Sequence, residues 1–153
     1  MAEIPIRSFL VSLVVLRETP EGARVLLLRR TQRLAGEWCQ VAGGIEEGET
    51  AWQAALRELK EETGLSPGRF YSADICEQFY EADRDAITIA PVFVAFVTDG
   101  EITLNEEHSD YRWVGFDEAR LMVPFPGQKR VLSHIVNHFL AKEPSKWLKI
   151  DIS

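Results

Sequence analysis

The sequence has few of the residues that mark secreted, zinc-binding or membrane proteins. It holds two cysteines and three histidines in 153 residues, and neither type shows the spacing of a zinc site or a disulfide framework. Every apolar run is shorter than the roughly 18 residues that a membrane span needs, and no signal-peptide pattern is present. We therefore expect a cytoplasmic protein in which Cys39 and Cys76 are buried thiols rather than a disulfide.

Positive charge is also scarce. Lys and Arg number 17 against 24 Asp and Glu, which gives a net charge of −7. This balance argues against binding to duplex nucleic acid, because such binding relies on clustered cations. A polyphosphate ligand would have to arrive with metal ions. The chain has no internal repeat or low-complexity segment, and its length fits one domain over residues 1–153.

The order of apolar patterns predicts an α+β fold. Runs rich in β-branched and apolar residues predict strands, and the first two of these runs are separated by a Pro/Gly turn that favours a hairpin. The expected strands cover residues 9–16, 25–28, 38–41, 70–80, 87–98 and 111–114. A closing helix is expected over residues 127–141, where two rows at i, i+4 and i+8 predict a core face: Val131, Ile135 and Phe139, with Leu132, Val136 and Leu140 beside them.

The most informative segment covers residues 43–65, GGIEEGETAWQAALRELKEETGL. Thr50 followed by Gln53 forms a capping-box pattern, which predicts a helix that begins at Ala51. Gly64 is the matching end signal. One face of this helix is apolar and is expected to pack against the core: Trp52, Ala55, Leu56 and Leu59.

The opposite face of the same helix is acidic. Glu58, Glu61 and Glu62 stand at i, i+3 and i+4, so their carboxylates share one face and repel each other. Clustered oxygen ligands of this kind suit hard cations such as Mg²⁺, Mn²⁺ or Ca²⁺. Arg57 precedes Glu61 by four residues and is predicted to orient it through a charge-assisted hydrogen bond.

This segment resembles the Nudix box, which is a glycine, five residues, a glutamate, seven residues, then Arg-Glu-apolar-any-Glu-Glu-any-Gly-apolar. The resemblance implies the Nudix α/β/α sandwich, a mixed sheet between helices. It also implies hydrolysis of a nucleoside diphosphate linked to another group. The positions that match the box are Gly43, Glu49, Arg57, Glu58, Leu59, Glu61, Glu62, Gly64 and Leu65.

The resemblance further assigns roles to individual residues. It implies Mg²⁺, with Mn²⁺ as a substitute, and it implies that one glutamate is the general base, with Glu58, Glu61 and Glu107 as the candidates. A solvated loop acid explains Glu107 equally well, and its neighbour Glu106 is the alternative. The implied metal ligands are Glu58, Glu61, Glu62, the carbonyl of Ala42, and Glu107. Glu49 has two interpretations, a metal ligand or a carboxylate at a helix start.

Other residues are candidates for substrate contacts. Arg30 or Arg33 could bind the β- or γ-phosphate, and a solvated basic cluster is the alternative. Trp38, Phe79 and Tyr80 could stack on a base, and core packing is the alternative. His134 and His138 stand at i, i+4 without a third ligand, which favours a surface pair.

The Nudix box leaves the identity of the substrate open. Two stretches of sequence resemble the small bacterial branch that converts deoxynucleoside triphosphates or dihydroneopterin triphosphate to a monophosphate and pyrophosphate. They are residues 37–50 and Glu107-His108 before Tyr111-Arg112-Trp113. Tyr80, sixteen residues after Gly64, is similar to a tyrosine in dinucleoside polyphosphate hydrolases. A nucleotide-sugar hydrolase and a non-catalytic nucleotide-binding regulator are further alternatives. The expected partner is a small nucleotide, and the protein could be a monomer or a homodimer.

Overall fold

The computed structural model describes residues 1–98 and 100–153. In this part of the chain one mixed eight-stranded sheet has the order β1-β7-β2-β3-β4, while β5 pairs with β2, β6 with β7, and β8 with β3. The strands are β1 (Ile6–Arg7), β2 (Leu10–Thr19), β3 (Gly22–Arg30), β4 (Trp38–Cys39), β5 (Val41–Gly44), β6 (Arg69–Glu81), β7 (Ala86–Phe96) and β8 (His108–Val114).

Strand β2 forms the centre of the sheet. It runs parallel to β7 and antiparallel to β3, and the predicted hairpin joins it to β3 through a turn after Thr19. Its apolar residues point to both faces, since Val14 belongs to one core cluster and Leu13 and Val15 belong to the other. An apolar run without polar alternation is what a strand covered on both faces requires.

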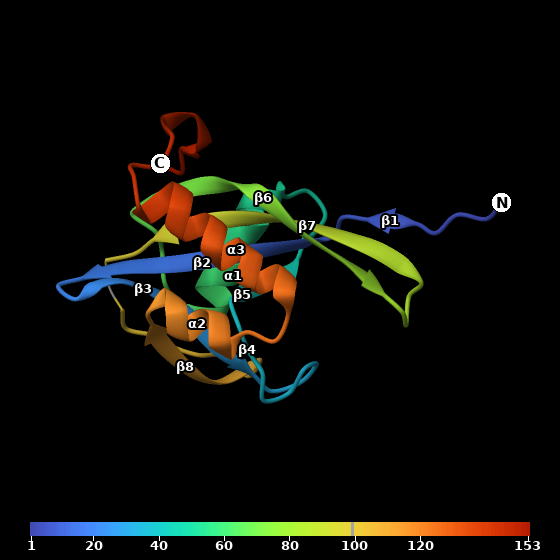
Figure 1. The fold of residues 1–153 in the computed structure, drawn as a ribbon, viewed down its shortest axis with the longest axis horizontal. Helices are drawn as coiled ribbons and strands as arrows, with labels where there is room; N and C mark the ends of the chain where they lie inside the picture. The colour runs from blue at the N-terminus through green and yellow to red at the C-terminus, as the bar shows by residue number, and fades with distance from the viewer. Residues whose placement is uncertain (99) are drawn as a thin grey trace.

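Helices cover both faces of this sheet (Figure 1). Helix α1 (Ala51–Thr63) packs on one face through residues such as Ala55 and Leu59. Helices α2 (Phe116–Met122) and α3 (Pro126–Ile135) pack on the other through residues such as Ala119 and Val131. A 3₁₀ turn at Lys146–Leu148 lies near the C-terminus. The predicted α/β/α sandwich with a mixed sheet is confirmed.

The expected limits of α1 are also confirmed. The backbone N–H of Gln53 donates to the hydroxyl of Thr50 at 3.2 Å, and the Gln53 side chain accepts from the Thr50 N–H at 2.8 Å. Gly64 ends the helix with φ 79° and donates its N–H to the Lys60 carbonyl, a left-handed conformation that glycine adopts without strain. Local capping chemistry therefore positions every carboxylate of the acidic face.

Three sequence expectations need correction. The closing helix is α-helical only to Ile135 and continues as a π-helical turn over Val136–Leu140, closed by the bond from the Ala141 N–H to the Val136 carbonyl. Cys76 is exposed rather than buried, although Cys39 is buried, and both thiols are free. The strand expected to reach residue 98 ends at Phe96.

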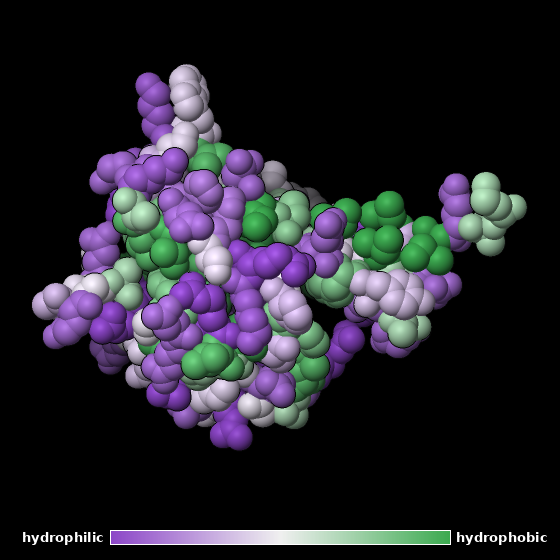
Figure 2. All heavy atoms as spheres, in the orientation of Figure 1, coloured by the Kyte–Doolittle hydropathy of each residue, from purple (hydrophilic) through white to green (hydrophobic). Residues whose placement is uncertain are grey.

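The long hairpin of β6 and β7 extends beyond the body of the molecule, with β1 beside it (Figure 1). Hydrophobic residues gather on this projecting part (Figure 2), where Ile6, Phe79 and Tyr80 are 67%, 41% and 57% exposed. The last residues of β6, next to the turn of the hairpin, form one wall of the cleft described below. Among the residues described, none of the helices has the length and apolarity to cross a membrane.

Candidate active site

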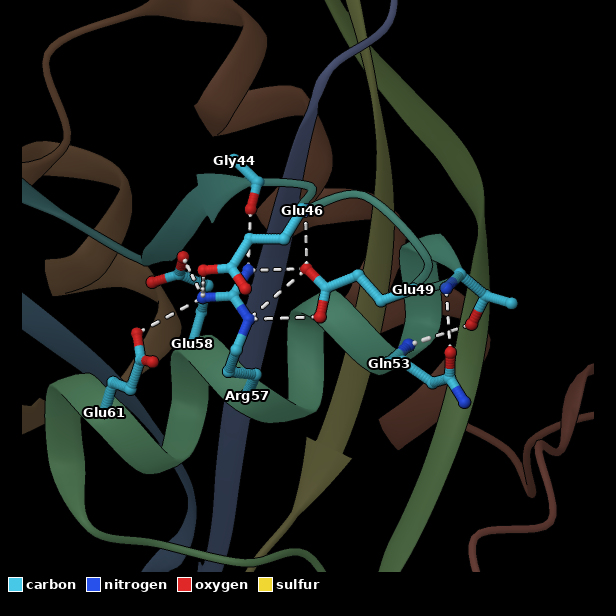
Figure 3. A network of polar contacts seen from close by, with 8 residues as sticks. Gly44, Glu46, Glu49, Gln53, Arg57, Glu58 and Glu61 are labelled. Atoms are coloured by element: carbon cyan, nitrogen blue, oxygen red, sulfur yellow. Dashed lines mark hydrogen bonds and ion pairs between the residues drawn. The ribbon is translucent and has the colours of Figure 1, made fainter.

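Arg57 is the centre of the polar network on α1 (Figure 3). Its Nη1 donates to Glu58 Oε1 at 2.9 Å and to Glu61 Oε2 at 3.2 Å. Its Nη2 donates to the Gly44 carbonyl at 2.8 Å, which ties the helix to the end of β5. The predicted contact between Arg57 and Glu61 is therefore confirmed.

Glu49 is the strongest partner of Arg57, and the sequence analysis did not pair the two residues. Glu49 Oε1 accepts from Nη2 at 2.6 Å, and Oε2 accepts from Nε at 3.1 Å, a two-pronged arrangement that suits the planar guanidinium. This contact lowers the pKa of Glu49 and raises that of Arg57. Glu49 also accepts the N–H of Glu46 at 2.7 Å, so it fixes the loop that leads into α1.

Gly43 allows Glu58 to approach β5 closely. A Cβ atom at position 43 would stand 2.2 Å from the Cδ of Glu58 and 2.3 Å from its Oε1, far inside van der Waals contact. Only a residue without a side chain lets the carboxylate lie there. Gly43 therefore fixes the distance between the acidic helix and the strand that carries Ala42.

Glu62 is the most deeply buried carboxylate of the helix, with 1% of its surface exposed, and it faces His108, which is 7% exposed. Glu62 Oε1 lies 3.5 Å from His108 Nδ1. Burial raises the pKa of Glu62, and the neighbouring carboxylates Glu58 and Glu107 add to the rise. Burial also lowers the pKa of His108 to about 4, with Arg30 adding to the effect, so a neutral imidazole stands beside Glu62.

The loop before β8 carries Glu107 toward the helix. The N–H of Thr31, just after β3, donates to the Glu107 carbonyl at 3.1 Å, and the Thr31 hydroxyl donates to the same oxygen at 2.9 Å. The Glu107 N–H donates to Asn105 Oδ1 at 3.1 Å. Burial raises the pKa of Glu107, and Glu58 and Glu61 act in the same direction. Carboxylates from the loop and the helix thus face one another.

A divalent cation fits this group of residues. Ligand atoms of Glu62, Glu107 and His108 all lie within 4.8 Å of one another. Glu62 Oε2 and His108 Nδ1 are buried without a hydrogen-bond partner among the described residues, and such atoms are rare in folded proteins. Carboxylates that repel each other and retain free lone pairs are what a hard cation requires.

The remaining predicted residues occupy different places around this group. Arg30 acts electrostatically on Glu62, Glu107 and His108, so it lies beside the carboxylates, and its Nε donates to the Arg33 carbonyl at 2.6 Å. Arg33 points elsewhere. Its Nη2 is 3.9 Å from Asp83 and 4.0 Å from Glu81, and its side chain is 66% exposed.

A cleft of about 830 Å³ opens next to the carboxylates. Its lining comes from β2, β5, the last residues of β6 and the loop into α3, and it includes Arg30, Ala42 and Gly43. Because Glu58 lies against Gly43, this end of the cleft borders the acidic face of α1. A second hollow of about 540 Å³ lies away from this group, at Phe116 and Leu140.

Several residues of the site were missed by sequence reasoning. His108 has no ligand spacing, and its only signal was its place after Glu107. Ser12 is a polar residue inside an otherwise apolar stretch of β2, and this interruption was the available signal. With Gln40 and Glu77 it lines the cleft. Trp38 packs partly buried against the core, which confirms the packing alternative for that residue.

His134 and His138 of the closing helix are not part of the group of possible metal ligands found among the described residues. His134 Nε2 lies 2.7 Å from the carbonyl of Ala73. The His134 and His138 rings are 4.7 Å apart between centroids. The carbonyl contact connects α3 to β6 and gives His134 a structural role.

Comparison with known proteins identifies the family of this chain. The model of the NUDIX domain matches residues 9–135, which include strands β2 to β8 and helices α1 to α3. The chain therefore belongs to the Nudix hydrolase family. The solved dihydroneopterin triphosphate pyrophosphohydrolase of Escherichia coli has the same fold, with a TM-score of 0.72 and 23% identity over 88% of this chain and 99% of that one.

Proteins with a similar sequence are named for several different activities. The pig bis(5'-nucleosyl)-tetraphosphatase (asymmetrical) is 35% identical over 62% of this chain and 67% of its own length. The nucleoside triphosphatase NudI of Escherichia coli is 34% identical over 61% of this chain and 74% of its own. An octanoyltransferase of Myxococcus xanthus is 32% identical over 80% of this chain. The chain spans only 35% of that longer protein.

Proposed function

We propose that this chain is a divalent-cation-dependent pyrophosphohydrolase that converts a nucleoside triphosphate, or dihydroneopterin triphosphate, to a monophosphate and pyrophosphate. One observation carries the proposal: the carboxylates of α1 and of the loop before β8 converge at the end of a cleft that is large enough for a nucleoside. Ligand sites of this size bury most of a small molecule. The polyphosphate of a bound nucleotide would then extend toward the carboxylates.

The proposed cation ligands are the carboxylates of α1, Glu107 and the carbonyl of Ala42. Mg²⁺, or Mn²⁺ in its place, would neutralise charge on the phosphate oxygens and make water more acidic. The chain's own contribution is to hold these oxygens in place. Arg57 orients Glu58 and Glu61 from one side, and Thr31 fixes the loop of Glu107 from the other.

Glu107 is our choice for the general base. Glu58 and Glu61 each accept a hydrogen bond from the Arg57 guanidinium, so each has one lone pair fewer to offer to an attacking water. The described residues donate no side-chain hydrogen bond to the Glu107 carboxylate, whose loop is held through its backbone. With one oxygen on the cation, its other oxygen would take a proton from an attacking water.

Arg30 is the better of the two candidate phosphate ligands. It lies beside the carboxylates and also lines the cleft, so it stands between the proposed nucleoside and cation sites. Its guanidinium would stabilise charge on the transferred phosphoryl oxygens. Arg33 faces Asp83 and Glu81 at the cleft wall, and we propose only a rim contact for it.

Product identification tests the proposal. The protein and Mg²⁺ are incubated with nucleoside triphosphates, dihydroneopterin triphosphate and diadenosine tetraphosphate, and the products are separated by anion-exchange chromatography. We expect a monophosphate and pyrophosphate from one triphosphate at a rate well above the others. Release of orthophosphate, or turnover that persists in the Glu61→Gln and Glu62→Gln variants, would contradict the proposed reaction and site.

Hydrolysis of a dinucleoside tetraphosphate is the second candidate. Phe79 and Tyr80 line the cleft and are 41% and 57% exposed, so they could stack on a second base at the cleft mouth. The similarity to the pig tetraphosphatase supports the same candidate. The Tyr80→Ala variant separates the two functions, because it should lower turnover of diadenosine tetraphosphate and leave that of a triphosphate nearly unchanged.

A further inference from the structure

Polar side chains that the proposed reaction does not use form a connected group at the floor of the cleft. Ser12 Oγ donates to Glu77 Oε1 at 2.9 Å, and Gln40 Nε2 donates to the same oxygen. Gln40 Nε2 also lies 3.1 Å from Ser12 Oγ. Gln128 Nε2 donates to Gln40 Oε1 at 3.4 Å. The group joins β2, β6, α3 and the residue between β4 and β5.

The direction of these bonds is set from outside the group. The backbone N–H of Phe125 donates to Gln128 Oε1 at 3.1 Å, so the Gln128 amide nitrogen must point toward Gln40. The Gln40 amide is then oriented with its nitrogen toward Glu77. Ser12 and Gln40 thus both donate to Glu77 Oε1, and the described residues donate no hydrogen bond to Glu77 Oε2.

Glu77 forms no ion pair with any residue that the structure describes. Arg33, which also lines the cleft, pairs instead with Glu81 and Asp83. Burial raises the pKa of Glu77, and the bonds from Ser12 and Gln40 act against this rise. A carboxylate at the floor of a cleft, with one oxygen saturated by neutral donors and the other free, is suited to accept hydrogen bonds from a ligand.

The walls of the cleft suit a planar ring. Phe79 and Phe125 line it and are 41% and 48% exposed, and aromatic rings stack readily on heterocycles. Ala42 and Gly43 lie at the end next to the carboxylates. A nucleotide with its ring over Glu77 therefore has its phosphates on the side of the acidic helix.

We propose that Glu77 is a specificity-determining residue that accepts hydrogen bonds from a ring N–H and an adjacent exocyclic amine, the pattern shared by guanine and pterin rings. Adenine and cytosine place a ring acceptor beside their amine, and that acceptor would repel a carboxylate. Uracil and thymine have a ring N–H between two carbonyl oxygens. Only the guanine-type edge offers two neighbouring donors. The inference rests on the proposed function for the position of the phosphates.

Calorimetric titration of the wild-type protein in magnesium buffer tests the inference without turnover. The probes are GMP, IMP, AMP and neopterin monophosphate, which are not substrates of the proposed reaction. We expect GMP to bind about tenfold more tightly than AMP, with IMP between them because it lacks the amine, since hydrogen bonds to a charged group are the stronger kind. Tighter binding of neopterin monophosphate than of GMP would show that the ring recognised by Glu77 is a pterin rather than guanine. Equal affinities, or binding of no probe, would overturn the inference.

The Glu77→Gln variant tests the residue itself. Its amide oxygen would accept from Ser12 and Gln40, which leaves the NH₂ group to face the ligand as a donor. We therefore expect the preference for GMP over AMP to fall about tenfold or to reverse. Glu118→Gln is the matched control, because Glu118 is half exposed in a pair with Arg112 and should leave the preference unchanged. An unchanged ratio in Glu77→Gln, with an unchanged Tm, would contradict a role in recognition.

The outcomes separate this inference from the proposed function. Hydrolysis of triphosphates without preference between guanine and adenine would contradict the proposed role of Glu77 and support the proposed reaction. A clear preference in binding, with no product from any triphosphate, would support the role of Glu77 and overturn the reaction.

Discussion

Glu62 and Glu77 are both carboxylates whose pKa is raised by burial, yet their surroundings are opposite. Glu62 faces two other carboxylates and a neutral histidine, and one of its oxygens has no partner. Glu77 faces neutral donors that are themselves held in place by hydrogen bonds. The first setting concentrates negative charge, whereas the second disperses it.

This difference indicates two kinds of ligand for two kinds of site. Crowded carboxylates with free lone pairs are stabilised most by a cation, because only positive charge relieves their repulsion. A single carboxylate supported by hydroxyl and amide donors is already compensated in part, and neutral N–H donors of a ligand can complete its hydrogen bonding. The predictions below test whether the two carboxylates can be distinguished by experiment.

The largest expected effect is on turnover. Glu62→Gln keeps the shape of the side chain and removes its charge, so we expect kcat to fall about a hundredfold or more, as the loss of several kcal/mol of charge stabilisation predicts. Glu77→Gln should change KM and base preference far more than kcat. Steady-state kinetics on the best triphosphate checks both. Comparable losses of kcat in the two variants would show that the carboxylates do not have separate roles.

The second prediction concerns protection by Mg²⁺. A ligand that binds only the folded state adds about 2.7 kcal/mol of stability at a hundred times its Kd, so Mg²⁺ should raise the Tm of the wild type and of Glu77→Gln. It should raise the Tm of Glu62→Gln much less. Differential scanning fluorimetry with and without Mg²⁺ measures this, with EDTA as the reference. Equal shifts in all three proteins would place the cation elsewhere.

The third prediction uses two neighbouring glycines of β5. Gly43→Ala places a Cβ 2.2 Å from Glu58 Cδ, whereas the nearest atom to a Cβ at Gly44 is 3.9 Å away. Overpacking of this kind costs about 1–3 kcal/mol, and it should displace Glu58 and lower kcat as well. Urea unfolding and kinetics compare the two variants. The contact of Glu58 with β5 would be refuted if Gly43→Ala were no less stable than Gly44→Ala.

Local rules were sufficient to predict α1, whereas the α/β/α sandwich was expected from the resemblance to the Nudix family. The capping pair of Thr50 and Gln53, the αL glycine at Gly64 and the helical period are all readable within a few residues, and they gave the acidic face correctly. The short helix α2 was missed because its N-cap, Gly115, makes no side-chain cap hydrogen bond. The exposure of Cys76 was missed because an irregularity between Ser72 and Cys76 interrupts the alternation of β6.

The different surroundings of the individual carboxylates could not be predicted from the sequence. Helical spacing places Glu58, Glu61 and Glu62 on one face, but the packing of β8 decides that Glu62 is buried against His108. Likewise, the contact of Glu77 with Ser12 joins residues 65 positions apart, and only the sheet topology brings them together. Which carboxylate meets a cation and which meets neutral donors is a long-range property of the fold.

The smallest expected effect is the pH dependence of stability at Glu77. Burial raises its pKa above the ordinary 4.5, so the folded state keeps a proton that the unfolded state has lost. The stability contributed by Glu77 is then fully present below pH 4.5 and is lost as the pH rises through the raised pKa, by less than about 1.4 kcal/mol per pH unit.

Glu77→Gln cannot titrate, and Ser12 and Gln40 carry no charge. Urea unfolding of the wild type and the variant from pH 4 to pH 8 should show the wild type losing stability relative to Glu77→Gln as the pH rises. A difference that stays constant, or that changes in the opposite direction, would mean that Ser12 and Gln40 stabilise the carboxylate enough to cancel the effect of burial.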